Sequence, residues 1–199
     1  MSASYQLLIG LGNPGVRYEA TRHNAGAWLL HRVAQRHATG FRSLPRCFGF
    51  VADADIEGIR LRLFRPDTFM NHSGRAVAAV AGFYKVPAER ILIAHDEIDL
   101  PPGTVRLKRG GGHGGHNGLR DVVPQLGDSG FSRIRIGVGH PGHRDRVVGH
   151  VLDRPSLAER GEIDDAIDRV VDDIARIARG DLEGAMNALH RRDRTTDEE

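Results

Sequence analysis

Two side chains of this 199-residue chain could together provide base catalysis: His23 in "TRHNAG" and Asp96 at the end of "ILIAHD". A carboxylate that accepts a hydrogen bond from one imidazole nitrogen orients the ring and favours the other nitrogen as a general base. The two residues are far apart in the sequence. The fold must therefore bring them together before they can act as a pair.

Amide side chains form a second group of candidates, and each of them lies in or beside a turn. An asparagine in a turn often has only a structural role, because it tolerates unusual backbone angles and caps helices. As a set, together with His116, these amides could polarise a carbonyl group and position a water molecule. They are Asn13 in "GNPG", Asn24 in "RHNAG", Asn71 in "FMNHSG" and Asn117 in "GHNG".

Two further motifs suggest other chemistries. "GLGNPG" (10–15) matches G-x-G-x-x-G, but no acidic residue for a ribose lies between Glu19 and Asp53, and Pro14 suits a tight turn better than a phosphate cradle. "GDSG" (127–130) follows His23 and Asp96 in the order of a serine protease of the all-β class. The helices expected in this chain favour a simple turn there instead.

Histidine pairs could in principle chelate a metal ion. His113 and His116 are three residues apart, as are His140 and His143. Both pairs lie in Gly- or Pro-containing segments, without the rigid helical spacing of H-E-x-x-H and without a cysteine pair or nearby carboxylate. We therefore expect no metal and no other cofactor.

The segment "RGGGHGGHNGLRD" (109–121) contains glycines at 110–112, 114, 115 and 118. Their backbone freedom would let His113, His116 and Asn117 close over a bound substrate and release it again. Basic residues precede the segment in "RLKRGGG" and recur in "RIRIGVG" (133–139). Such side chains could hold a phosphate without reading a nucleotide sequence.

Strands are predicted at 5–11, 59–64, 91–96 and 133–139, the second and last alternating like strands covered on one face only. Helices are predicted at 24–38, 73–86, 117–127, 158–180 and 181–192. This alternation predicts one α/β domain over residues 1–192, with a twisted, mixed but largely parallel sheet flanked by helices on both faces. Residues 193–199 are expected to form a frayed acidic tail.

Topology and composition narrow the function further. Ligand sites in such sheets lie at the carboxyl ends of strands, where Asn13, His95 and Asp96 are expected. The chain is 40% hydrophobic and 27% charged with net charge +2, which excludes disordered and fibrous classes. A single cysteine, Cys47, excludes an internal disulfide, and the start "MSASYQLLIG" has no signal-peptide pattern. We expect a cytoplasmic protein without a membrane span.

Several blocks, in order over about residues 5–190, closely resemble the bacterial type of peptidyl-tRNA hydrolase. They are "GLGNPG", "YEATRHNAGAW", "TFMNHSG", "AHDEIDLPPG", "GGGHGGHNGLRD" and "RIRIGVGHP". The resemblance implies a monomeric enzyme that cleaves the ester between a peptide and the terminal ribose of tRNA, without metal. A non-catalytic RNA-binding relative, or a nucleotide-binding protein that uses "GLGNPG", remains the alternative.

The resemblance also implies residue roles. His23 matches the catalytic base, Asp96 the carboxylate that keeps it basic, and Asn13 the position that distinguishes blocked from free aminoacyl groups. Lys108 and Arg135 match a clamp on the acceptor-stem phosphate. The remaining substrate-contacting positions are Tyr18, Phe69, Asn71, His116 and Asn117.

Overall fold

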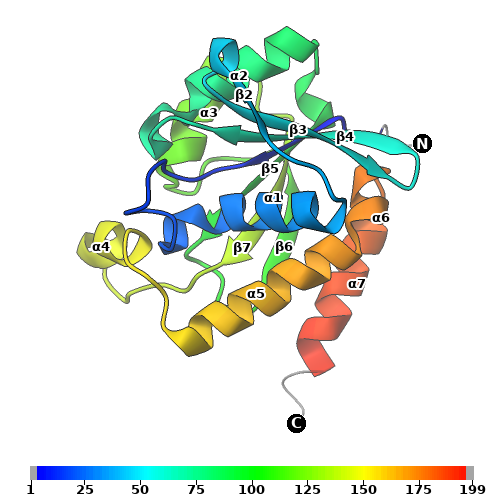
Figure 1. Cartoon of the computed structure of the whole chain (residues 1–199). Helices are drawn as coiled ribbons and strands as arrows, with labels where there is room; N and C mark the ends of the chain where they lie inside the picture. The colour runs from blue at the N-terminus through cyan, green and yellow to red at the C-terminus, as the bar shows by residue number, and fades with distance from the viewer. Residues whose placement is uncertain (1–3, 196–199) are drawn as a thin grey trace.

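One mixed sheet organises the computed structural model, which describes residues 4–195, and the side chains up to Leu189 (Figure 1). Its strands follow the order β2-β3-β4-β1-β5-β7-β6. The four central strands are mutually parallel: β4 (Ile59–Pro66), β1 (Leu7–Gly10), β5 (Ile91–Glu97) and β7 (Ser132–Gly137). Antiparallel strands that the sequence had not indicated complete both edges: β2 (Arg42–Leu44), β3 (Gly49–Ile56) and β6 (Val105–Arg109).

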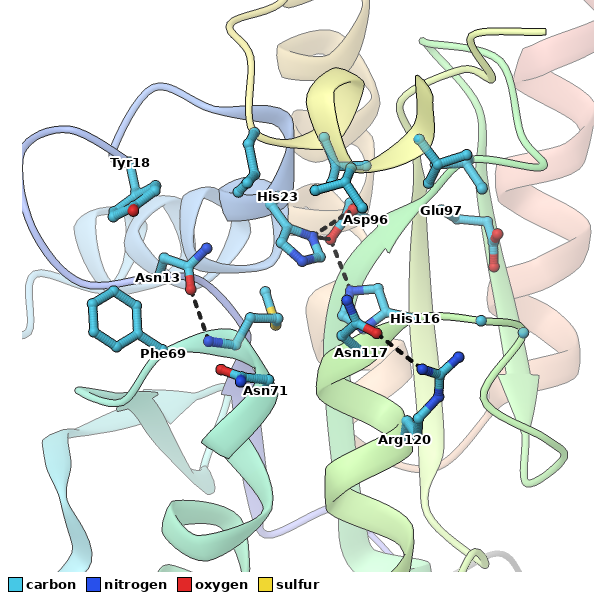
Figure 2. A pocket seen from close by; sticks show the side chains of 18 of the residues that line it. Asn13, Tyr18, His23, Phe69, Asn71, Asp96, Glu97, His116, Asn117 and Arg120 are labelled. Carbon is cyan, nitrogen blue, oxygen red and sulfur yellow. Dashed lines mark hydrogen bonds and ion pairs between the residues drawn. The ribbon is translucent and has the colours of Figure 1, made fainter. Parts of the chain in front are cut away.

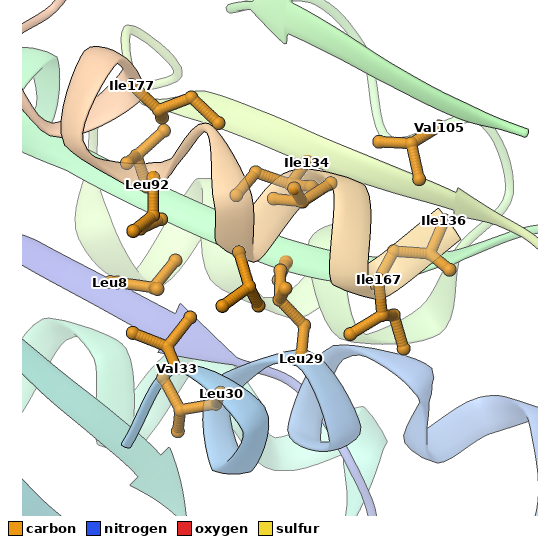
Figure 3. Packing of buried hydrophobic residues seen from close by; sticks show 14 of the residues in the cluster. Leu8, Leu29, Leu30, Val33, Leu92, Val105, Ile134, Ile136, Ile167 and Ile177 are labelled. Atoms are coloured by element: carbon orange, nitrogen blue, oxygen red, sulfur yellow. The ribbon is translucent and has the colours of Figure 1, made fainter. Parts of the chain in front are cut away.

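Helices cover both faces of this sheet, as predicted. One face packs against α1 (Ala25–Arg36), α5 (Leu157–Asp172), α6 (Ile174–Ala178) and α7 (Leu182–Thr195). Figure 3 shows this core, in which Leu29, Val33 and Ile167 meet Leu92 and Ile134 of the sheet. The other face packs against α2 (Ser73–Tyr84) and α3 (Asn117–Leu126). A short helix that was not predicted, α4 (Val147–Val151), lies beside the start of α1.

The predicted C-terminal helix is divided at Asp173, where α5 ends and α6 begins. Its apolar face nevertheless continues through the break, because Ile163, Ile167, Ile174 and Ile177 are all buried. Helix α7 continues to Thr195, and the remaining part of the expected tail, 196–199, lies outside the described residues. Within residues 4–195, no helix combines the length and the apolar character that crossing a bilayer requires.

Glycines explain how "GLGNPG" and the start of α1 come together. A Cβ on Gly26 would lie 2.2 Å from the carbonyl oxygen of Ala94, and a Cβ on Gly10 would lie 2.5 Å from that of Gly26. Only glycine permits such a close approach of helix and strand backbones. As a result, α1 begins directly beside the carboxyl ends of β1 and β5.

The strand at 133–139 differs from the expectation of one exposed face. Strand β7 lies between β5 and β6, and Arg133, expected to face solvent, is only 4% exposed. The alternation of arginine and isoleucine therefore reflects two different buried surroundings. The isoleucines contact the helical core, and Arg133 lies beneath the glycine segment.

Candidate active site

A pocket of about 560 Å³ opens at the carboxyl ends of β1 and β5, at the edge where the topology predicts a ligand site. Most of the residues singled out from the sequence line it: Asn13, Tyr18, His23, Phe69, Asn71, Asp96, His116 and Asn117. Figure 2 shows these side chains converging from four separate segments of the chain. Lys108 and Arg135 do not line this pocket.

His23 and Asp96 form a buried hydrogen-bonded pair. Nδ1 of His23 lies 2.9 Å from both carboxylate oxygens of Asp96, and both residues are less than 10% exposed. His23 belongs to a 3₁₀ turn (Arg22–Asn24) that leads into α1, whereas Asp96 lies near the end of β5. The pairing leaves Nε2 of His23 on the pocket side, where its lone pair can accept a proton.

His116 gives Asp96 a second imidazole partner. As the N-cap of α3, it accepts hydrogen bonds at Nδ1 from the backbone N–H groups of Gly118 and Leu119. Because Nδ1 accepts, the ring proton lies on Nε2, which donates to Oδ1 of Asp96 at 2.9 Å. One carboxylate therefore orients two imidazole rings.

Opposing effects determine the ionisation of the pair. Burial would raise the pKa of Asp96, but His23 and His116 outweigh it and hold this pKa well below the usual 3.8. For His23 the charged form is the protonated one, so burial lowers its pKa, but attraction and hydrogen bonding by Asp96 raise that pKa above 6.5. The carboxylate is consequently ionised and accepts a hydrogen bond from the N–H at Nδ1 of His23.

His95, the other polar residue near the end of β5, has a supporting position. Its ring is 1% exposed and meets the ring of His116 edge to face, with centroids 4.9 Å apart. Its Nδ1 donates to the backbone carbonyl of Asp96 at 2.7 Å. Burial, reinforced by His116, lowers the pKa of His95 to about 3, so the ring stays neutral at neutral pH.

The two histidine pairs considered from the sequence as possible metal chelators make other contacts. Nδ1 of His113 accepts from Gly115 N–H, and Nδ1 of His140 accepts from Gly142 N–H, both local bonds within loops. Instead, the donor atoms of His23, Asp96 and His116 lie within 4.8 Å of one another, a spacing that a divalent cation could bridge. An ion there would have to displace both imidazole protons that point at Asp96.

Asn13 is held in one orientation by two neighbours. Asn24 bonds the backbone of Asn13 twice, accepting from its N–H at 2.9 Å and donating to its carbonyl at 3.0 Å. The side-chain oxygen of Asn13 accepts from the N–H of Met70 at 2.7 Å. Its amide nitrogen is thereby left as a donor toward the pocket. Met70 was not singled out from the sequence, because its contribution is a backbone group.

The remaining amides lie at the mouth of the pocket. Asn71 follows Met70 at the start of α2, and Asn117 is the first residue of α3, where Arg120 donates to its side-chain oxygen at 3.3 Å. Tyr18 and Phe69 meet edge to face with ring centroids 6.1 Å apart. Phe69 is 53% exposed, so a large apolar surface borders the polar groups.

An apolar wall completes the pocket, and the sequence analysis missed it. It consists of Val147, Val148, Val151 and Leu152, in and just after α4. Arg22, which precedes His23, holds this segment by donating to the carbonyls of His150 and Asp153 and to Glu159. The clustered valines of "RVVGHVL" were the available signal in the sequence.

Of the predicted clamp residues, Lys108 lies on the edge strand β6, next to the glycine segment, and Arg135 lies on β7 beside it. In the β6–β7 pairing, Lys108 is opposite Arg133 and Arg106 is opposite Arg135, which places all four on one face of the sheet. Nε of Arg135 donates to Glu97, a residue that lines the pocket, at 2.9 Å. These basic residues thus border the pocket without entering it.

The glycine segment is less uniform than its composition indicates. Gly118 was expected to add flexibility, but it is buried in the first turn of α3, where a Cβ would lie 2.5 Å from Sδ of Met70. Its role is close packing between α3 and the Met70 turn. His116, the N-cap of α3, and Gly118 therefore belong to the start of the helix rather than to the loop.

Comparison with known proteins agrees with this geometry. The family model described as peptidyl-tRNA hydrolase matches residues 7–197. The peptidyl-tRNA hydrolase of Halorhodospira halophila is 54% identical over 94% of this chain and 96% of its own, and that of Alcanivorax borkumensis is 52% identical over 96% and 98%. The crystal structure of peptidyl-tRNA hydrolase from Acinetobacter baumannii superposes with a TM-score of 0.91 at 44% identity, covering 95% of this chain and 96% of that one.

Proposed function

This chain belongs to the peptidyl-tRNA hydrolase family and hydrolyses the ester bond of peptidyl-tRNA, and on that premise we propose which residues perform the reaction. His23 is the general base. The observation that carries this assignment is its buried pairing with Asp96, which leaves Nε2 as the acceptor facing the pocket.

In the proposed reaction, Nε2 of His23 takes a proton from a water molecule as that water attacks the ester carbonyl. When the tetrahedral intermediate collapses, the bond between the carbonyl carbon and the ribose oxygen breaks, and the imidazolium of His23 returns the proton to that oxygen as the free tRNA leaves. Asp96 holds the ring in the required tautomer and stabilises the imidazolium that forms. His116 donates to Asp96 throughout, which keeps the carboxylate ionised and oriented. No step in this sequence requires a metal ion.

Negative charge develops on the carbonyl oxygen as water attacks, and neutral amide donors can stabilise it. Asn71 and Asn117 border the pocket on the side of α2 and α3, opposite the start of α1 that carries His23. Arg120 donates to the side-chain oxygen of Asn117, which leaves the amide nitrogen of Asn117 as the free donor. We assign oxyanion stabilisation to these two amides.

Asn13 is assigned to substrate selection. Its side-chain oxygen is occupied by the N–H of Met70, so its amide nitrogen faces the substrate as a donor. A donor suits the carbonyl oxygen of a blocked amino group and repels a free ammonium group. The apolar wall of α4, with Tyr18 and Phe69, would contact the peptide itself.

The reaction is tested with N-acetylated and free aminoacyl-tRNA. We expect release of the blocked amino acid only, and an unchanged rate after addition of a chelator, because the proposed chemistry is metal-free. Loss of activity upon chelation would contradict the metal-free mechanism. If the folded protein bound both tRNAs but cleaved neither, it would be a non-catalytic relative.

For the tRNA part of the substrate, we assign phosphate binding to Lys108 and Arg135. Both project from the same face of neighbouring strands, and a Cβ on Gly111 would lie 3.2 Å from Nζ of Lys108. The ammonium group therefore lies against the glycine segment that leads into the pocket. A phosphate bound here would place the end of the acceptor stem near the catalytic groups.

Replacing both Lys108 and Arg135 by alanine should raise KM and flatten its dependence on salt, because two phosphate contacts are lost. Steady-state assays over a series of salt concentrations measure this slope. The matched control is Arg42→Ala with Arg60→Ala, which removes the same charge from β2 and β4, in the other half of the sheet. An equal change of slope in both double variants would show that only net charge matters.

We further propose that the protein works as a monomer in the cytoplasm, where translation supplies its substrate. All the groups assigned above come from one chain, and the catalytic groups meet at the carboxyl ends of its central strands. This arrangement supports a monomer, because no second copy is needed to complete the site.

A further inference from the structure

Arg133 is a buried cation that the proposed reaction does not use. It projects from β7 beneath the glycine segment and is 4% exposed. Nη1 donates to the carbonyl oxygen of Gly112 at 3.0 Å, and Nη2 donates to that of Gly110 at 2.7 Å. One guanidinium group thus holds two carbonyls of the same loop.

The chemistry of this contact favours arginine over lysine. The planar guanidinium group presents several N–H donors in a rigid fork, so it can bond two carbonyls at once. Gly111 lies between those carbonyls at a left-handed φ of 88°, and a Cβ there would lie 3.0 Å from Nη2. The backbone consequently wraps closely around the charged group.

Further bonds fix the two ends of the segment. At its start, Gly110 N–H donates to the carbonyl of Phe131 on the approach to β7 at 2.9 Å. At its end, Asp121 of α3 accepts from Gly74 N–H of α2 at 2.7 Å, and Gly118 packs against Met70. Both ends of the segment are therefore tied to the helices and strands that carry the site.

Residues 113–115 lie between these anchors and differ from them in their hydrogen bonds. These bonds join only neighbours: Gly115 N–H donates to Nδ1 of His113, and His116 N–H donates to the His113 carbonyl. Gly114 and Gly115 have φ values of 57° and 83°, which glycine adopts at no steric cost. Both glycines line the pocket.

We propose that Arg133 is a positioning residue that confines motion of the glycine segment to residues 113–115, so that substrate binding has to order only that short part. The inference rests on the proposed function of the pocket beside it. It differs from the expectation that all the glycines of the segment 109–121 take part in its closure over the substrate. Gly110 and Gly112 belong to the fixed half, and His116 is held by α3.

Loss of Arg133 should therefore affect binding more than chemistry. Without the two hydrogen bonds of the guanidinium group, residues 110–112 also move. The conformational entropy lost when substrate binding orders them then weakens that binding. We expect Arg133→Met to raise KM about 10-fold, with kcat within about threefold of wild type, because α3 still holds His116 against Asp96. Arg133→Lys keeps the charge but not the fork, so it should give an intermediate KM.

Hydrogen exchange tests the same idea without substrate and thus independently of the proposed function. In Arg133→Met, amide exchange over 110–112 should accelerate about 10-fold or more, whereas exchange in α3 should be unchanged. Arg106→Met is the matched control, since it removes a charge from the same face and leaves both carbonyl contacts in place. It should leave exchange over 110–112 as in wild type.

Unchanged exchange over 110–112 in Arg133→Met, or a fall in kcat at constant KM, would overturn the proposal. If Arg133→Met does not fold, the Arg133→Lys variant provides the test. Wild-type values of KM and of exchange over 110–112 in Arg133→Lys would show that only the charge at this position matters, and not the two hydrogen bonds of the guanidinium group. A wild-type protein that exchanged as expected but cleaved no peptidyl-tRNA would refute the proposed catalytic roles and leave the positioning role intact.

Discussion

A His23→Ala variant should hydrolyse N-acetylated aminoacyl-tRNA about 10²- to 10⁴-fold more slowly in kcat, with little change in KM. The expected loss is that of a general base. Tyr18, Phe69 and the α4 wall remain in place to bind the substrate, because the side chain of His23 is hydrogen-bonded to Asp96 and not to them. Single-turnover release of the acetylated amino acid would measure the chemical step directly.

His143→Ala is the matched control for this experiment. His143 is an exposed histidine outside the pocket lining, and its loss should leave the single-turnover rate unchanged. Circular dichroism and thermal unfolding of both variants would establish that each is folded. A folded His23→Ala variant that retained the wild-type rate would show that another group activates the water.

Replacing Asp96 by asparagine should reduce kcat by a similar factor and also change its pH dependence. In wild type, Asp96 raises the pKa of His23 above 6.5 despite burial, and activity falls as the pH drops through that pKa because the protonated ring cannot accept a proton. In Asp96→Asn the attraction is lost while burial remains. The pKa of His23 then falls, and the acid limb moves to lower pH.

The measurement is kcat/KM from about pH 5 to about pH 9, which reports ionisations in the free enzyme. His116→Ala serves as the comparison, since it removes the other imidazole from Asp96 but leaves the His23–Asp96 pair. Its acid limb should stay where it is in wild type. An acid limb at the same pH in Asp96→Asn and wild type would mean that the limb does not report His23.

Local patterns were sufficient for the elements that position the site. Continuous runs of apolar residues predicted β1 and β5, because a strand covered on both faces is apolar along its length, whereas alternation of apolar residues with arginine predicted β4 and β7. Helical periodicity predicted α1, α2 and α3 for the corresponding reason. Strands β2, β3 and β6 were missed, since β2 has a single apolar residue, β3 contains two aspartates, and the alternation of β6 extends over only Val105 and Leu107.

Residue types alone also identified several polar groups of the pocket, including His23, Asp96 and Asn117, and the family resemblance added Tyr18 and Phe69. They could not identify Met70, which contributes its backbone N–H, nor the α4 wall, whose valines resemble any short apolar run. The roles of Arg22 and Arg133 were equally invisible. Each is a buried arginine that donates to backbone carbonyl groups, and every residue type carries a carbonyl.

The sequence by itself determined the α/β class, the family and the set of polar groups available for hydrolysis, because periodicity and motif order are properties of neighbouring residues. Tertiary structure alone decided which groups act together. It placed His116 on the same carboxylate as His23, and it packed Gly118 against Met70 while leaving open space beside Gly114. Such assignments depend on distances between segments far apart in the chain, and hydrogen bonds form only when those segments meet.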